Sequence, residues 1–236
     1  MQEICEWIAE NPLYLLLAIG TIFNLFWLGR FRAQLQISRT TVIILSVLHT
    51  IFGVMSVWLF AKIEIIAGMS DGGRFSLFGG VFFMPIVYLT IAKLIRKQPE
   101  KVFDIFTICI LFTLMCARIG CIISGCCQGR IIPGLDIRYP TREVEVCFYI
   151  ITIIILGKKV CKGEKKGKIY PIYMISYGIF RFIEEFFRDK TNATIVHPSH
   201  IWALLCLVIG ISFYLEMKVT DNKEKKIRGR RKEKHD

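Results

Sequence analysis

The residues best suited to chemistry lie in the sixth apolar run of the chain, which carries ionised side chains. Tyr177, Arg181, Glu184 or Glu185, and Arg188 recur at steps of three or four residues. A helix would therefore align them along one face. A bare Arg at the centre of a membrane helix costs roughly 2.5 to 3.5 kcal/mol, so such residues usually face a cavity and pair. The stripe predicts a polar site; a simple Arg181–Glu185 bridge near the membrane surface is the alternative.

Arg118 is another ionised residue inside an apolar run, near the end of that run expected outside the membrane. Its guanidinium can hold a phosphate through two parallel hydrogen bonds, which Lys cannot do. Gly120, Ser124, Gly125 and Gly129 follow it. Such small residues permit either close helix contact or a backbone cradle for an anion. We expect Arg118, Ser124 and Gly125 to help bind an anion, with ordinary helix packing as the alternative for each glycine.

A third motif, Tyr-Pro-Thr-Arg-Glu-Val-Glu over residues 139–145, opens the fifth apolar run. Thr141 is expected to cap the helix that begins here. Arg142 and Glu145, three residues apart, would share one helix face. The motif predicts either a capping and orienting role or an acidic member of the site.

The elements that position these residues are expected to be membrane helices. Of the 236 residues 54% are apolar, and the mean hydropathy is +0.51, above the 45 to 50% or so usual for soluble domains. The net charge of +12 comes from short clusters between apolar runs, which is the pattern of cytoplasmic loops. This distribution argues against a nucleic-acid partner, which would need a basic face.

Seven apolar runs each approach the ~20 residues that a spanning helix needs. We predict an all-α polytopic membrane protein with the N-terminus outside and the C-terminus cytoplasmic. A single transmembrane domain is expected over 1–218, followed by a basic cytoplasmic tail over 219–236 whose end is frayed. The third run contains Gly79, Gly80 and Pro85, which predict a broken or re-entrant first turn. The runs are 13–28, 41–61, 75–95, 102–123, 144–156, 169–187 and 200–217.

Most of the 31 Lys and Arg fall in the loops that alternate counting assigns to the cytoplasm, which fixes this orientation. The first run follows an acidic segment and has neither a basic flank nor a small-residue cleavage site. We therefore expect it to be a retained span and not a cleaved signal peptide.

Three motifs in this order carry a family resemblance: Arg118-Ile-Gly followed by Ser-Gly, the motif at 139–145, and the stretch from Tyr177 to Arg188. Together they resemble the prolipoprotein diacylglyceryl transferase family. The resemblance covers roughly residues 71–215. It implies transfer of a diacylglyceryl group from phosphatidylglycerol to the lipobox cysteine of a prelipoprotein at the bacterial inner membrane, without cofactor or metal. It implies catalytic roles for Arg118, Arg181 and Glu185, and substrate binding by Tyr177, Glu145, Arg188, Gly79, Gly80, Ser124 and Gly125.

The sequence departs from this family at three positions. Phe78 holds the position of the family's motif histidine, Cys121 that of an asparagine and Cys126 that of a glutamate. Because phenylalanine cannot take a proton, a general base is missing. His197 and His200 are expected on the outer side and are candidates for this role, or else polar caps at the helix start.

The nine cysteines lie mostly inside apolar runs, but Cys121, Cys126 and Cys127 cluster. They allow three interpretations: packing, a redox or metal site, or the wall of a lipid pocket. Three thiols without a fourth ligand make an incomplete structural zinc site, and helix geometry disfavours a bridge. Two further functions therefore stay open: a catalytically silent lipid-headgroup-binding or lipid-moving protein, and a membrane thiol protein that needs all three cysteines but not Arg181.

Overall fold

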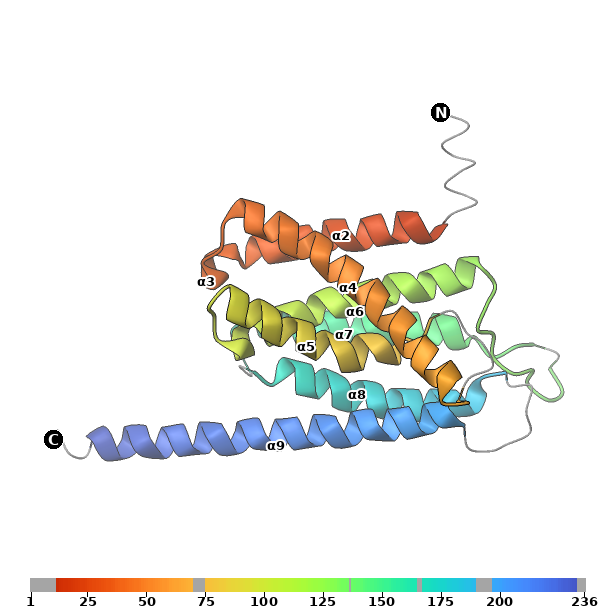
Figure 1. The fold of residues 1–236 in the computed structure, drawn as a ribbon. Helices are drawn as coiled ribbons and strands as arrows, with labels where there is room; N and C mark the ends of the chain where they lie inside the picture. Colours follow the sequence, from red (N-terminus) through yellow and green to blue (C-terminus); the bar gives the residue numbers. More distant parts are fainter. Residues whose placement is uncertain (1–11, 70–74, 136, 165–166, 190–196, 233–236) are drawn as a thin grey trace.

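The computed structural model describes residues 12–69, 75–135, 137–164, 167–189 and 197–232 (Figure 1). One long helix coincides with each predicted apolar run, and these residues form no named strand, so the all-α fold class is confirmed. The elements are α2 (Pro12–Arg30), α3 (Arg32–Leu35), α4 (Arg39–Ile66), α5 (Phe78–Leu94), α6 (Pro99–Ile123), α7 (Thr141–Cys161), α8 (Ile169–Glu184), the 3-10 turn η1 (Glu185–Phe187) and α9 (Pro198–Lys232).

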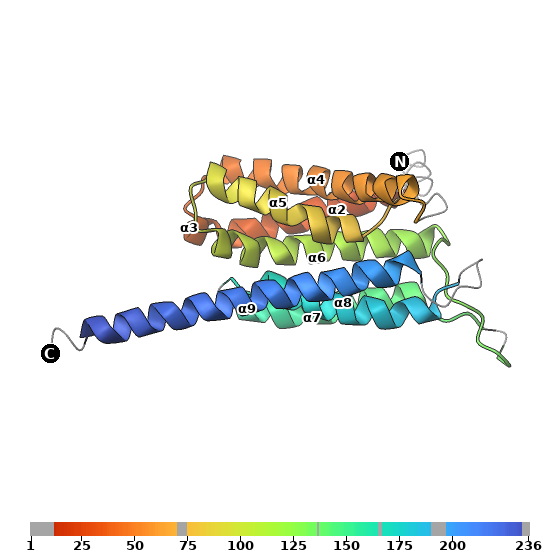
Figure 2. The same ribbon diagram turned by 60° about the horizontal axis from the view of Figure 1, so that its bottom comes forward.

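The helices form a bundle with α6 at its centre. Figure 2 shows α2, α4 and α5 on one side of α6, and α7, α8 and α9 on the other. Helix α6 contacts α2, α4, α5, α7 and α8. Its most apolar stretch is 67% buried, against 22% for that of α9. Residues on α6 are therefore in position to meet those of both halves of the bundle.

The outer surface is apolar, as expected of a protein surrounded by lipid. Large exposed side chains include Phe26, Trp58, Ile86, Ile151 and Val208. Among the described residues, three helices are long and apolar enough to cross a membrane: α4, α6 and α9 over Pro198–Thr220. Helices α2 and α5 are apolar but shorter. These apolar helices are consistent with a membrane protein.

Helix α5 corrects one prediction. It is a regular helix that begins at Phe78 and contains Gly79, Gly80 and Pro85, so the expected break in its first turn was wrong; residues 70–74 lie outside the described residues. A Cβ at Gly79 would lie 2.1 Å from the carbonyl oxygen of Ser56 in α4. Glycine therefore lets the backbones of α4 and α5 touch, and the tertiary contact holds the helix together.

Helix α9 corrects a second prediction. It continues to Lys232, through most of the segment expected to be a frayed end, and extends well beyond the other helices (Figure 1).

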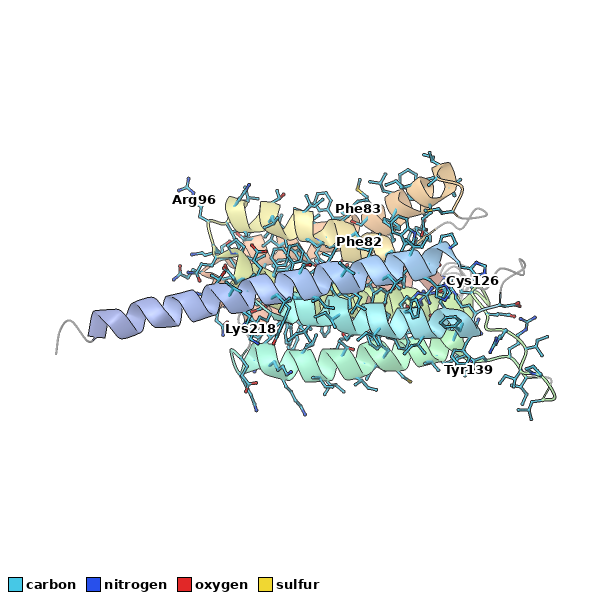
Figure 3. The ribbon with its side chains drawn as sticks, turned by 90° about the horizontal axis from the view of Figure 1, so that it is seen from below. Phe82, Phe83, Arg96, Cys126, Tyr139 and Lys218 are labelled. Atoms are coloured by element: carbon cyan, nitrogen blue, oxygen red, sulfur yellow. The ribbon has the colours of Figure 1, made fainter. Side chains whose placement is uncertain are left out.

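The two ends of the bundle differ in charge. Figure 3 places Arg96 and Lys218 at one end, with Cys126 and Tyr139 at the other. The basic turns between α2 and α4, between α5 and α6, and between α7 and α8 all lie at the first end. At this end Asp104 accepts hydrogen bonds from the backbone N–H of Gly167, at 2.7 Å, and of Ile169, at 3.2 Å, which fixes the start of α8 against α6.

Candidate active site

Three helices meet at the carboxylate of Glu145, near the end of the bundle opposite the basic turns. Arg118 Nε, from α6, lies 2.6 Å from Glu145 Oε2 on α7. Arg181 Nη1, from α8, lies 4.0 Å from the same oxygen. The hydroxyl of Tyr149 donates to Glu145 Oε1 at 3.3 Å. Since the Arg118, Arg181 and Glu145 side chains are at most 7% exposed, their charges compensate each other away from water.

Arg181 is the most heavily paired group of this cluster. Its Nη2 lies 2.7 Å from Glu185 Oε2, and its Nη1 also pairs with Glu184. Arg188 Nη1 lies 3.7 Å from the same Glu185 oxygen. The predicted Arg181–Glu185 bridge thus exists, but as part of a network that spans α7, α8 and η1. The predicted stripe of Tyr177, Arg181, Glu185 and Arg188 is confirmed as one largely buried group.

Glu64, which is 8% exposed on α4, was not among the predicted site residues. It interacts with Ser76 and electrostatically with Arg181 and Glu185. The signal was present, because an ionised residue in an apolar helix is functional by default. It was lost because the second apolar run was ended at residue 61, whereas α4 continues to Ile66.

The chain beyond α6 folds back onto its own helix end. Helix α6 stops at Ile123, and Gly125 (φ +69°) and Cys127 (φ +55°) turn the backbone through left-handed conformations. Arg142 Nη1 donates to the carbonyl oxygens of Cys121, at 3.3 Å, and Cys126, at 3.2 Å. Arg142 therefore has the orienting role expected of its motif, and the segment that it orients is this loop.

Thr141 does not cap α7, which corrects a prediction. The helix begins at Thr141 itself, with Pro140 in the cap position and no side-chain cap hydrogen bond. The threonine hydroxyl instead donates to the carbonyl oxygen of Cys127 at 3.2 Å. The preceding proline fixes the helix start, which releases the hydroxyl to hold the loop.

The loop gathers the three clustered cysteines. The sulfur atoms of Cys121, Cys126 and Cys127 all lie within 4.8 Å of one another, and Cys126 and Cys127 are exposed. Packing, one of the three interpretations, does not describe exposed thiols. A hydrogen bond from the Cys121 thiol, together with the Arg188 and Arg118 guanidiniums, holds the pKa of the Cys127 thiol well below its usual range.

The comparison with known sequences agrees with this geometry. The family model described as prolipoprotein diacylglyceryl transferase matches residues 13–216. The chain belongs to this family. It is 25% identical over 164 residues to a phosphatidylglycerol–prolipoprotein diacylglyceryl transferase of Clostridium tetani (63% of this chain, 65% of the relative). It is 30% identical over 123 residues to transferase 2 of Clostridium perfringens (45% of this chain, 48% of the relative). The chain thus spans about half to two thirds of the length of these curated relatives.

Within the diacylglyceryl transferase family, the departure at Phe78 falls inside the site. The ring of Phe78 lies 5.9 Å from the guanidinium carbon of Arg181 and 5.8 Å from the ring of Tyr177. The buried Tyr177 hydroxyl has no hydrogen-bond partner among the described residues. An apolar ring therefore lies beside Arg181 where the family resemblance implies an imidazole.

The two candidate histidines lie at the start of α9. The Nδ1 of His200 accepts a hydrogen bond from the backbone N–H of His197 at 3.1 Å, and its ring packs against Phe182 and Phe186 at 5.2 and 4.6 Å. This is the polar-cap role, the second of the two alternatives considered.

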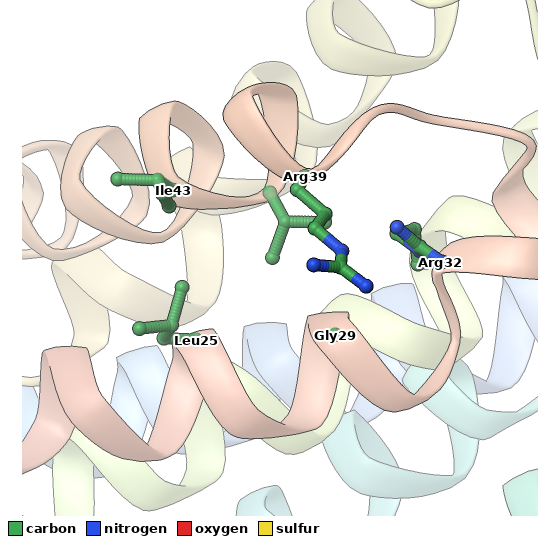
Figure 4. A pocket seen from close by; sticks show the side chains of 6 residues that line it. Leu25, Gly29, Arg32, Arg39 and Ile43 are labelled. Carbon is green, nitrogen blue, oxygen red and sulfur yellow. The ribbon is translucent and has the colours of Figure 1, made fainter.

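The predicted substrate-binding small residues occupy different surroundings. Gly79 and Gly80 are buried where α5 meets α4 and α6, whereas Ser124 and Gly125 are exposed beside the cysteine loop. A cavity of about 420 Å³ lies at the opposite, basic end, between α2 and α4 (Figure 4). Arg32 and Arg39 line it with apolar side chains, so it is separate from the Arg118–Arg181 site.

Proposed function

We propose that this protein transfers a diacylglyceryl group from phosphatidylglycerol to the cysteine thiol of a prelipoprotein lipobox. The observation that carries the proposal is the meeting of Arg118 and Arg181 at one buried carboxylate oxygen. A leaving glycerol phosphate gains negative charge in the transition state, and two preorganised guanidiniums can stabilise it in a site of low dielectric constant.

The two arginines have different roles in this proposal. Arg118 pairs with Glu145 through Nε, and its two Nη groups are proposed to hold the phosphate. These can donate to a phosphate in parallel. Arg181 is already surrounded by Glu145, Glu184 and Glu185, so it fixes the carboxylates and contributes positive charge. Tyr177 and Arg188 complete the wall, with Ser124 and Gly125 near the headgroup.

The proposed orientation follows from the charge of the two ends. We propose that the seven long helices all cross the bacterial inner membrane, with the basic end in the cytoplasm. The site then lies towards the outer face. Phosphatidylglycerol could enter laterally through the lipid, while a lipobox peptide reaches the same site from outside.

The test is transfer of radiolabelled diacylglyceryl from phosphatidylglycerol vesicles to a lipobox peptide by the purified chain. We expect a labelled peptide with the wild type, none with a peptide whose cysteine is replaced by serine, and at least about a hundredfold loss in Arg181→Ala. A wild type that binds the vesicles but labels nothing would overturn the proposal.

A second candidate function is favoured by one observation, the apolar Phe78 ring beside Arg181. Without a base, the arginine-lined site could bind lipid headgroups and perform no transfer. Phe78→His separates the two functions: transfer that appears only in this variant would show a lipid-binding protein silenced at this position. Transfer by the wild type would exclude silence.

A further inference from the structure

The cysteine loop is a built feature that the proposed function does not use. Helix α7 holds the backbone carbonyl of each of the three cysteines: Arg142 binds those of Cys121 and Cys126, and Thr141 binds that of Cys127. Cys127 has a φ of +55°, which non-glycine residues seldom adopt. The backbone is fixed by these bonds while the three thiol groups point towards one another.

The arrangement of the sulfur atoms fits a thiolate metal site. Zinc binds thiolates at about 2.3 Å, which places sulfur atoms about 3.8 Å apart around a tetrahedron. The three sulfurs already lie within 4.8 Å of one another. Side-chain rotations that move each sulfur by about 1 Å would bring them to the spacing of a zinc site. Closed structural zinc sites use four protein ligands, whereas catalytic sites use three and keep one position open. Among the described residues, the three cysteines form the group with metal-binding geometry.

The surroundings suit the charge of such a site. Three thiolates and one Zn²⁺ carry a net negative charge. The guanidiniums of Arg118 and Arg188 are close enough to interact electrostatically with Cys127, and Cys121 follows Arg118 by one turn of α6. The same arginines therefore border both the cysteine cluster and the Glu145 network. An ion here would lie next to the site proposed for the lipid phosphate.

We infer that Cys121, Cys126 and Cys127 bind a zinc ion whose open fourth position takes the cysteine thiol of the acceptor. The binding site stands on the geometry of the loop, while the role in thiol activation rests on the proposed function. A thiol that coordinates zinc is bound as thiolate, so the ion does what a general base would do. The zinc site would supply the activation of the acceptor thiol that Phe78 cannot supply.

The proposed step balances without an oxidant or reductant. The acceptor thiol gives its proton to water as it binds Zn²⁺, whose charge does not change. The sulfur electron pair then forms a C–S bond to the carbon of the diacylglyceryl unit that is bonded to the phosphate oxygen. The C–O bond breaks, and its electron pair leaves on the phosphate oxygen of glycerol phosphate, beside Arg118. A thioether and glycerol phosphate are the products.

A disulfide explains the loop less well. Cys126 and Cys127 are adjacent, and a bridge between neighbours is strained. A bridge from Cys121 to either one leaves the third thiol without a role, although α7 holds its carbonyl in the same way. A zinc ion uses all three.

The first test measures metal content. The full chain is purified in detergent with reductant, equilibrated with Zn²⁺, freed of excess metal, and analysed by mass spectrometry for zinc. We expect about one zinc per chain in the wild type and in Cys161→Ser, the control at the opposite end of α7, where the thiol is also exposed. Cys121→Ser, Cys126→Ser and Cys127→Ser should each lose at least about tenfold in zinc affinity.

Wild-type protein without zinc, or with zinc that survives all three serine variants, would overturn the metal site. A thiol titration that finds a disulfide between two of the three cysteines in protein purified without reductant, and no metal after reduction, would overturn it as well.

The second test addresses the open position. Co²⁺ bound in place of Zn²⁺ should give thiolate-to-metal charge-transfer absorption, and a cysteine-containing lipobox peptide should increase it while its serine analogue does not. An unchanged spectrum with both peptides would overturn the acceptor role. Transfer assayed in parallel separates the two proposals: transfer by zinc-free protein contradicts the inference alone, whereas zinc binding without any transfer contradicts the proposed function and leaves the metal site.

Discussion

Arg118 Nε and Glu145 Oε2 are 2.6 Å apart and join α6 to α7 inside the bundle. Since Glu145 is 1% exposed, removing its charge leaves Arg118 buried without its partner. Breaking a buried ion pair from one side costs about 3 to 5 kcal/mol. We therefore predict that Glu145→Gln lowers the unfolding temperature of the detergent-solubilised protein by roughly 10 °C.

Glu164→Gln is the matched control, because it removes the same charge from the Lys162–Glu164 pair, in which Glu164 is 51% exposed and the two atoms are 4.0 Å apart. Exposed pairs contribute about 0 to 1 kcal/mol, so its unfolding temperature should change little. Equal losses in both variants would show that the Arg118–Glu145 pair is not specially stabilising.

Gly79 was predicted to bind substrate, and the structure offers a way to separate that role from packing. A Cβ at this position meets the Ser56 carbonyl at 2.1 Å, so Gly79→Ala should force α4 and α5 apart and cost about 1 to 3 kcal/mol or more. Thermal unfolding measures this loss. Gly29→Ala, in α2 with nothing within 4 Å of the added Cβ, should be neutral or slightly stabilising. A Gly79→Ala protein of normal stability with a raised KM for phosphatidylglycerol would instead support substrate binding.

The helix pattern was predictable because run length and charge between runs are written directly in the sequence. The stripe of Tyr177, Arg181, Glu185 and Arg188 was predictable for the same reason, since helix periodicity alone places them on one face. The meeting of Arg118 with Glu145 was not, because it depends on how α6 and α7 pack.

The cysteine loop shows most clearly where sequence reasoning ends. Gly125 follows the cap residue of α6 in a left-handed conformation (φ +69°), which ends the helix; in a helix that ran on past Ile123 the three thiols would lie on different faces. The loop after α6 is held by hydrogen bonds from Arg142 and Thr141, which lie beyond the loop in the chain. The expectation that helix geometry disfavours a bridge applies only within a helix, whereas α6 ends at Ile123 and Cys126 and Cys127 lie in the loop beyond it.

Arg142 should act as a positioning residue for the thiols. Its Nη1 holds two cysteine carbonyls, and the ammonium of Lys, carried on a side chain one bond shorter, does not reach the position of this nitrogen. We predict that Arg142→Lys weakens zinc binding about 10- to 100-fold, measured by competition with a chromophoric chelator. Arg130→Lys changes another guanidinium of the same loop, which lies 5.4 Å from the Phe187 ring, and should leave zinc affinity within about twofold. Equal weakening in both would argue for a general loss of loop structure.

The last prediction concerns Phe78, whose ring lies beside the guanidinium of Arg181. An imidazole there could accept the acceptor's proton, and a positioned general base contributes about 10²- to 10⁴-fold. If zinc already generates the thiolate, Phe78→His should change wild-type transfer little but restore transfer at least about tenfold in the zinc-deficient Cys127→Ser protein. Phe78→Leu in the same background removes the ring without supplying a base and should restore nothing. A Phe78→His gain in transfer that is equally large in both backgrounds would mean that the thiols do not activate the acceptor. The absence of a base at position 78 would then limit the rate of transfer in this protein.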